Sequence, residues 1–317
     1  DKKTNSIVDA TVKETDIATL KTLTNRNNNN NYTIKIEDSS VNPDDLKKID
    51  DSFPLCRIDA SSIKTIKGSV EEINNLYTNL PPVHYSLGIK GLGNEDFILP
   101  LENTSNNFEA SDLIELQNKT TGSIILESTE SWNGNVKITG SITNIKNAYD
   151  SLISNIESDN YTLKISDPNL SATAIKTLNE PTDAIIDASS VTTLSGSITD
   201  IKNAYNSTSI TGLNNSAINL NDESISTNDL NDLDNKTNKK ITATVKETDI
   251  ATLKLLKNQN NNNNYAIKIN DSSVEANDLN TVVNKTSAVV DASSVTTLSG
   301  SITDIKNTYD STIITGL

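Results

Sequence analysis

The stretch Asp187-Ala-Ser-Ser-Val-Thr-Thr-Leu-Ser-Gly-Ser-Ile-Thr-Asp-Ile-Lys-Asn-Ala-Tyr205 recurs as residues 291–309 with a single change, from Ala204 to Thr308. A second stretch, residues 10–21, returns as residues 243–254. Self-similarity of this kind is typical of repeat arrays, in which each unit packs against its neighbours. The repeats therefore indicate how the chain is built and which residues serve as scaffold.

Short segments of alternating apolar and polar residues within the repeats predict strands. The clearest are residues 32–37, 161–166 and 265–270. Polar turns and short helices follow them, and the helix starts are marked by capping sequences such as Ser197-Ile-Thr-Asp200. We count about eleven such cycles, each of roughly 22 to 35 residues, which is the range of solenoid repeats.

Strand–turn–helix cycles this short predict parallel strands with right-handed crossovers. The expected fold class is α/β: a repeat solenoid of strand–turn–helix units with a parallel sheet and helices on one face, the other face being polar. Whether each cycle holds one strand or two, with residues 191–195 as a second, stays open. We expect one continuous solenoid, a fragment of a longer array, with repeat units in residues 1–80 and 135–317 and divergent units or an insertion in residues 81–134.

The composition excludes several classes of partner. The chain has 317 residues, of which 34% are hydrophobic and 4% aromatic, and its formal net charge is -15. An acidic surface is a poor match for nucleic-acid phosphates or for an anionic membrane. The sequence contains no apolar run long enough to span a bilayer, so we expect no membrane insertion.

Three equivalent aspartates are the candidate metal ligands. Asp59, Asp187 and Asp291 each begin an Asp-Ala-Ser-Ser segment. Asp side chains in this position form tight turns by accepting hydrogen bonds from nearby backbone N–H groups, which explains them without a ligand. Calcium bridging between stacked turns is the alternative, although the EF-hand pattern is absent.

The residue types that carry chemistry are scarce. His84 is the only histidine and Cys56 the only cysteine, so the sequence offers no zinc constellation. We expect Cys56 to be a buried, inert thiol. His84 and Trp132 lie in the divergent segment and are the candidate binding residues. With no nucleophile placed beside a base, we expect no enzyme activity and no cofactor.

The segment Val-Asp-Ala-Ser-Ser-Val-Thr-Thr-Leu-Ser-Gly-Ser-Ile-Thr-Asp-Ile, residues 290–305, combines with Ile210-Thr-Gly-Leu213 and helices that contain Asn-Asp-Leu. In this combination the chain resembles the repeats of giant cell-surface proteins of marine cyanobacteria and related marine bacteria. The resemblance implies a secreted, surface-displayed or filamentous protein, such as a coat, an adhesin or a motility factor. It supplies no catalytic residues.

The function expected from the sequence is that of a structural repeat segment of an extracellular or cell-surface protein, acting as coat, filament or adhesive spacer. Its expected partner is another copy of itself, bound head to tail or laterally, because the array shows no polar caps. The alternative is a binding module that recognises a glycan or a surface protein through the polar strand face or through residues 81–134.

Overall fold

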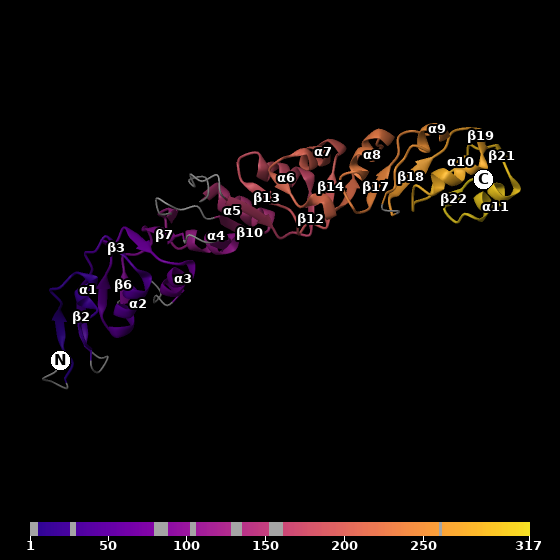
Figure 1. The fold of residues 1–317 in the computed structure, drawn as a ribbon. Helices are drawn as coiled ribbons and strands as arrows, with labels where there is room; N and C mark the ends of the chain where they lie inside the picture. The colour runs from indigo at the N-terminus through magenta and orange to yellow at the C-terminus, as the bar shows by residue number, and fades with distance from the viewer. Residues whose placement is uncertain are drawn as a thin grey trace. The chain divides into compact units, whose positions relative to one another are not determined.

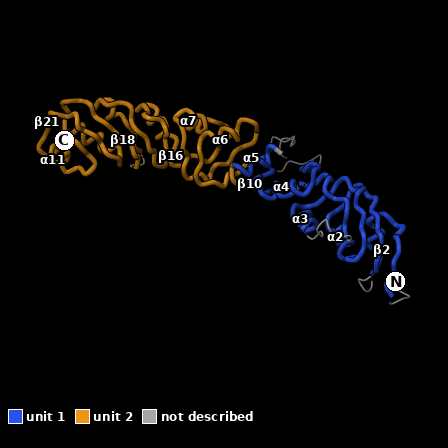
Figure 2. Tube along the Cα trace, turned by 180° about the vertical axis from the view of Figure 1, so that it is seen from behind, with its two compact units in different colours: residues 1–139, 143–161 blue, residues 140–142, 162–317 orange. Residues whose placement is uncertain are grey.

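The computed structural model describes residues 6–25, 30–78, 88–101, 106–127, 135–151, 161–259 and 262–317. These residues form an α/β fold with eleven α-helices, and every strand pairing among them is parallel. The predicted α/β class and parallel pairing are confirmed. The chain divides into two compact units, residues 1–139 with 143–161 and residues 140–142 with 162–317 (Figure 2).

Unit 1 alternates one or two short strands with a short helix. Strands β1, β2, β4 and β6 form one sheet, β3, β5, β7 and β9 a second, and β8 pairs with β10. Its elements are β1 (Asp9–Thr11), α1 (Ile17–Leu20), β2 (Asn31–Lys35), β3 (Ser40–Val41), α2 (Pro43–Ser52), β4 (Arg57–Asp59), β5 (Thr65–Lys67), α3 (Val70–Thr78), β6 (Gly88–Lys90), β7 (Asp96–Pro100), β8 (Asn106–Glu109), α4 (Ala110–Gln117), β9 (Ile124–Glu127), β10 (Val136–Gly140) and α5 (Ile142–Ser151), the last two crossing the unit boundary.

Unit 2 repeats the same cycle, and its successive strands lie side by side (Figure 1). Strands β11, β13 and β15 pair in that order, as do β12, β14, β16, β17, β18, β20 and β22, while β19 pairs with β21. Its elements are β11 (Tyr161–Ile165), β12 (Asn169–Ser171), α6 (Ala172–Asn179), β13 (Ile185–Asp187), β14 (Thr193–Gly196), α7 (Ile198–Asn206), β15 (Ile210–Thr211), β16 (Ala217–Leu220), α8 (Thr227–Asp234), β17 (Ile241–Thr244), α9 (Ile250–Leu253), β18 (Asn264–Lys268), β19 (Ser273–Glu275), α10 (Ala276–Val283), β20 (Val290–Asp291), β21 (Thr297–Ser299), α11 (Ile302–Asp310) and β22 (Ile314–Thr315).

Neighbouring strands pair equivalent residues of consecutive cycles. Ile34 lies opposite Ile58, which in turn lies opposite Ile89 one cycle further along the chain. In unit 2, Ala243 lies opposite Tyr265 in the same way. Because each pairing advances the sequence by one cycle, inward-facing side chains of successive strands stack on one another and form the core.

The predicted alternation within strands is confirmed. In β2, Tyr32 and Ile34 are buried whereas Thr33 and Lys35 are exposed. Strands β11 and β18 bury the equivalent apolar residues. The structure differs from the expectation of one long sheet: many cycles hold two short strands, separated by the polar turn, and the strands of unit 2 belong to several sheets. The turn interrupts the strand, so the two halves pair separately.

Helix starts follow the predicted caps. The Ser69 hydroxyl accepts from the Glu72 N–H while the Glu72 carboxylate accepts from the Ser69 N–H, which is a capping box. Asn42 caps α2 with Pro43 at its first position. Among the described residues no helix combines the length and the apolar character that a bilayer-spanning helix requires.

Candidate functional site

The three candidate aspartates each form the predicted turn. The Oδ1 atoms of Asp59, Asp187 and Asp291 accept a hydrogen bond at 3.0 Å from the backbone N–H of the serine two residues further on. At Asp291 the hydrogen bonds from the Ser293 N–H and then from its hydroxyl hold the pKa of the carboxyl below its ordinary value. The turn alone therefore accounts for these acids.

The surroundings of the three aspartates favour a turn over a calcium site. Each lies opposite a lysine of the preceding parallel strand, the pairs being Lys35 with Asp59, Lys164 with Asp187, and Lys268 with Asp291. A calcium ion requires six to eight oxygen ligands, and a facing ammonium group opposes its charge. Within the described ranges, no group of three or more His, Cys, Asp or Glu side chains is arranged to hold a metal ion.

Of the remaining candidate residues, the structure describes Cys56 but not His84 or Trp132. Cys56 is fully buried; its Sγ donates to the Asn30 carbonyl at 3.3 Å and accepts from the Tyr32 N–H at 3.2 Å. The expected burial is confirmed, and it raises the pKa of this thiol, which favours the protonated form. His84 and Trp132 lie outside the described residues.

Carboxylates of one repeat cap the helix of the preceding repeat. In five helices the first backbone N–H donates, at 2.6 to 2.8 Å, to a carboxylate oxygen that lies about one cycle later in the sequence. The pairs are Ile17 with Asp38, Ile142 with Asp167, Ile198 with Asp222, Thr227 with Glu247, and Ile250 with Asp271. Helix N-termini carry unsatisfied N–H groups and partial positive charge, so a carboxylate stabilises them.

This cap was missed by reasoning from the sequence. Polar turns were predicted to follow the strands at residues 32–37 and 265–270. The structure shows that the first residues of these turns, Asp38 and Asp271, reach with their carboxylates the helices that begin at Ile17 and Ile250. Each capping acid comes two or three residues after a strand, and the sequence signal was its recurrence at a nearly constant distance from a preceding helix start. Because a local turn already accounted for an aspartate at these positions, nothing in the sequence prompted a search for a partner in the preceding repeat.

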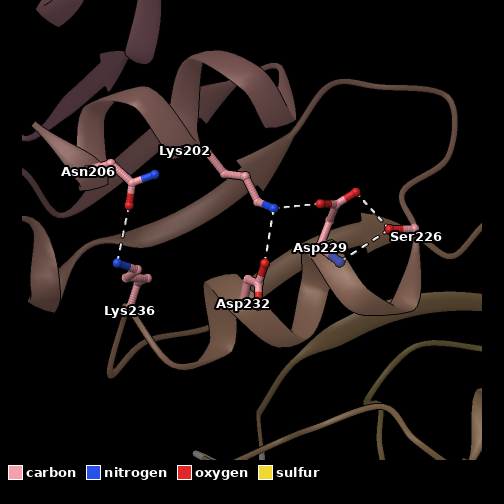
Figure 3. A network of polar contacts seen from close by, with 6 residues as sticks. All are labelled: Lys202, Asn206, Ser226, Asp229, Asp232 and Lys236. Atoms are coloured by element: carbon pink, nitrogen blue, oxygen red, sulfur yellow. Dashed lines mark hydrogen bonds and ion pairs between the residues drawn. The ribbon is translucent and has the colours of Figure 1, made fainter.

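A network of charged groups joins helices α7 and α8 (Figure 3). The Lys202 Nζ donates to Asp229 Oδ1 at 2.5 Å and to Asp232 Oδ2 at 3.2 Å. The Ser226 hydroxyl, at the N-cap of α8, donates to the other oxygen of Asp229 at 2.7 Å. Toward the other end of the two helices, Lys236 donates to Asn206 at 3.2 Å. One lysine therefore pairs with two acids of the next helix, and Lys236 adds a second link between the two helices.

The electrostatics of this network suit attachment rather than acid–base chemistry. The Lys202 ammonium, and then the Ser226 hydroxyl, lowers the pKa of Asp229, while Asp229 raises the pKa of Lys202. Both shifts move away from neutral pH, whereas a general acid or base is tuned toward it.

The adjoining pocket, about 290 Å³, is lined largely by residues of the same two helices. One of them is Tyr205, whose hydroxyl donates to the Leu213 carbonyl at 3.0 Å. Burial raises the pKa of Tyr205 to about 12, so this phenol remains protonated.

The same kind of contact recurs along the chain. Lys21 pairs with Asp45 at 2.7 Å between α1 and α2, and Lys254 pairs with Asp278 at 2.8 Å between α9 and α10. Lys21 and Lys254 occupy equivalent positions of the longer repeat. The charged side chains of the helix layer thus link consecutive repeats.

This arrangement joins consecutive repeats through carboxylate caps at the N-termini of five helices and through lysine–carboxylate pairs between three pairs of helices. No protein-family model matches the chain, and no curated protein and no solved structure shows significant similarity to it.

Proposed function

We propose that this chain is a structural repeat segment of an extracellular or cell-surface protein, an α/β solenoid of strand–turn–helix units that acts as coat, filament or adhesive spacer. The observation that carries the proposal is the use of the charged residues. Five carboxylates cap the helix of the preceding repeat, and three lysines pair with acids of the next helix. Lysine and carboxylate side chains, which serve catalysis in many enzymes, join one repeat to the next in this chain.

The solenoid interpretation is supported by the register of the strands. Paired positions such as Ala243 with Tyr265, or Ile58 with Ile89, lie one cycle of the chain apart. A protein in which every unit contacts mainly its neighbours has stability that grows with the number of units. Such a protein suits a role that depends on length, and the acidic composition suits an exposed, self-repelling surface.

The location is tested by immunogold electron microscopy with antibodies raised against this chain. Intact cells of the source organism should be labelled at their outer surface, and permeabilised cells should give little additional label. Label that requires permeabilisation and lies inside the cell would overturn the proposed location. Pre-immune serum serves as the control for background.

A binding module is the second candidate, and one observation favours it. The strand face of unit 1 holds an open hollow of about 460 Å³ lined by Thr33, Arg57, Asp59 and Lys90 among others. Hydroxyl, guanidinium and carboxylate groups on one face are the kind that hydrogen-bond to sugars. A glycan array probed with the chain, and with Arg57→Ala as the matched variant, tests it: binding lost in the variant supports a module, and an array without hits removes it.

A further inference from the structure

The strand that leads into the Asp-Ala-Ser-Ser turn differs between unit 1 and unit 2. Strand β4 carries Arg57 two residues before the turn aspartate, whereas the equivalent positions of the other two copies hold Ile185 and Val289. All three side chains are exposed, so the core requires none of them. The charge at this position is therefore a property of unit 1 and not of the repeat.

The next strand of unit 1 adds a second cation. Lys90 of β6 lies opposite the turn aspartate Asp59. The residues opposite the two equivalent aspartates of unit 2 are Thr211 and Thr315. Two departures from the repeat, each of which introduces a cation, thus lie on adjacent strands of one sheet.

The two cations line the open hollow of about 460 Å³ on the strand face of unit 1, which we term the Arg57 hollow. Thr33 and Asp59 line it as well. Arg57 lies between Thr33 on one neighbouring strand and Gly88 on the other. Glycine contributes no side chain that would fill the space beside the guanidinium, so the hollow remains accessible from that side.

The charges of the Arg57 hollow are not balanced internally. Within the described residues, neither the Arg57 guanidinium nor the Lys90 ammonium forms an ion pair or a hydrogen bond. The neighbouring Lys35 is already paired, because it donates to Glu37 at 2.7 Å. The hollow therefore retains two cations and one carboxylate, that of Asp59, in a chain whose formal net charge is -15.

These groups match a sugar that carries a carboxylate. A guanidinium presents parallel N–H groups whose geometry fits both oxygens of a carboxylate. The Asp59 carboxylate accepts hydrogen bonds, and the Thr33 hydroxyl both donates and accepts, so each suits sugar hydroxyls. A surplus of one positive charge suits one carboxylate per sugar, whereas nucleic acid requires a broad basic surface that this acidic chain lacks.

We propose that the Arg57 hollow binds an acidic sugar, with the Arg57 guanidinium on its carboxylate, Lys90 as a second positive charge beside it, and Asp59 on its hydroxyls. The inference rests on the second candidate function, the binding module, and names the class of its ligand. The equivalent strands of unit 2 lack both cations, so this kind of site occurs once among them.

Isothermal titration calorimetry of the full 317-residue chain with tetragalacturonate, at low ionic strength, tests the proposal. The fully methyl-esterified tetrasaccharide keeps the sugar rings but lacks the charges, and it should bind at least about tenfold more weakly. Arg57→Gln and Lys90→Gln should each weaken binding of the acidic form by about tenfold. Arg57→Lys should recover only part of the affinity, because an ammonium lacks the fork of a guanidinium.

Lys164→Gln is the matched control variant. Lys164 lies opposite Asp187 on the equivalent strands of unit 2, so its removal should leave the affinity unchanged. Circular dichroism verifies that each variant is folded. Equal binding of the acidic and esterified sugars overturns the assignment to an acidic sugar and leaves the binding module standing. Absence of binding by either form, or an equal loss in Lys164→Gln and Arg57→Gln, also overturns it, whereas surface labelling of intact cells is unaffected by these outcomes.

Discussion

Residues 187–205 and 291–309 form nearly identical sequences with different burial, and the contrast separates what a repeat contributes from what its neighbour contributes. The local features are the same in both copies: Ser197 and Ser301 cap their helices at 3.1 Å, and both turn aspartates accept at 3.0 Å. Leu194 and Ile201 of the first copy are fully buried, whereas their equivalents Leu298 and Ile305 are half-buried; of the two copies, and within the described residues, only the first has its helix capped by a carboxylate of the following repeat. The pair of copies therefore separates the stability that a segment contributes by itself from the stability that its neighbour contributes.

The largest difference is expected for the core leucine. Leu194→Ala should lower the free energy of unfolding by about 2 to 5 kcal/mol, because it leaves a cavity among fully buried side chains. Leu298→Ala, the same change in the half-covered copy, should cost about 1 kcal/mol, because the site is already open to water. Urea unfolding gives the loss, and amide hydrogen exchange in β14 and β21 shows where it falls. Equal losses at the two positions would contradict the role of the neighbouring repeat.

The next effect is the cap supplied by the following repeat. Asp222→Ala removes the acceptor of the Ile198 N–H and should lower the free energy of unfolding by about 1 kcal/mol, as the loss of a helix cap does. The matched control is Asp310→Ala, at the exposed end of α11, which should change stability little. Faster hydrogen exchange confined to the first turn of α7 would identify the lost cap. Unchanged exchange there would show that the carboxylate contributes nothing.

Features that depend on contacts within a few residues were predictable from the sequence. The strand at Tyr32, the helix cap at Ser197 and the turn at Asp187 were all predicted, and the structure places them as expected. The side-chain contacts between repeats were not predictable, because Asp222 and Glu247 bind helices that begin about one cycle earlier, and sequence alone does not show which side chain of a repeat reaches its neighbour. The candidate calcium ligands followed from the equivalent positions of three aspartates in the Asp-Ala-Ser-Ser segments, whereas their lysine neighbours follow only from strand register.

A smaller effect is expected at the lysine that joins α7 to α8. Lys202→Ala should cost less than about 1 kcal/mol, because half-exposed ion pairs contribute little, and Lys306→Ala in the other copy should cost nothing measurable. The pKa of Asp229 is lowered from 3.8, chiefly by Lys202, and the pair therefore stabilises the fold above that ordinary value. This stabilisation is lost as the pH falls through the lowered pKa.

Carboxyl carbon chemical shifts of Asp229 give the direct measurement. In Lys202→Ala the pKa should rise toward 3.8 but remain below it, because Ser226 still donates a hydrogen bond. The difference in stability between the two proteins should shrink as the pH falls below 3.8. A pKa that does not move when Lys202 is removed would show that the ion pair does not form in solution.

The smallest contrast is expected at the turn aspartates, where the two copies should behave alike. Asp187→Ala and Asp291→Ala each remove the acceptor of the serine N–H two residues on, a contact inside one repeat. The losses of stability should therefore be small and equal, although one copy is covered and the other is not. Thermal unfolding with added calcium and with a chelator should give the same midpoint for the unmodified chain, because each turn already satisfies its carboxylate and faces a lysine. If calcium raised the midpoint and Asp187→Ala abolished the rise, that aspartate would be a metal ligand. Its contribution to stability would then come from a contact between repeats and not from a turn within one repeat.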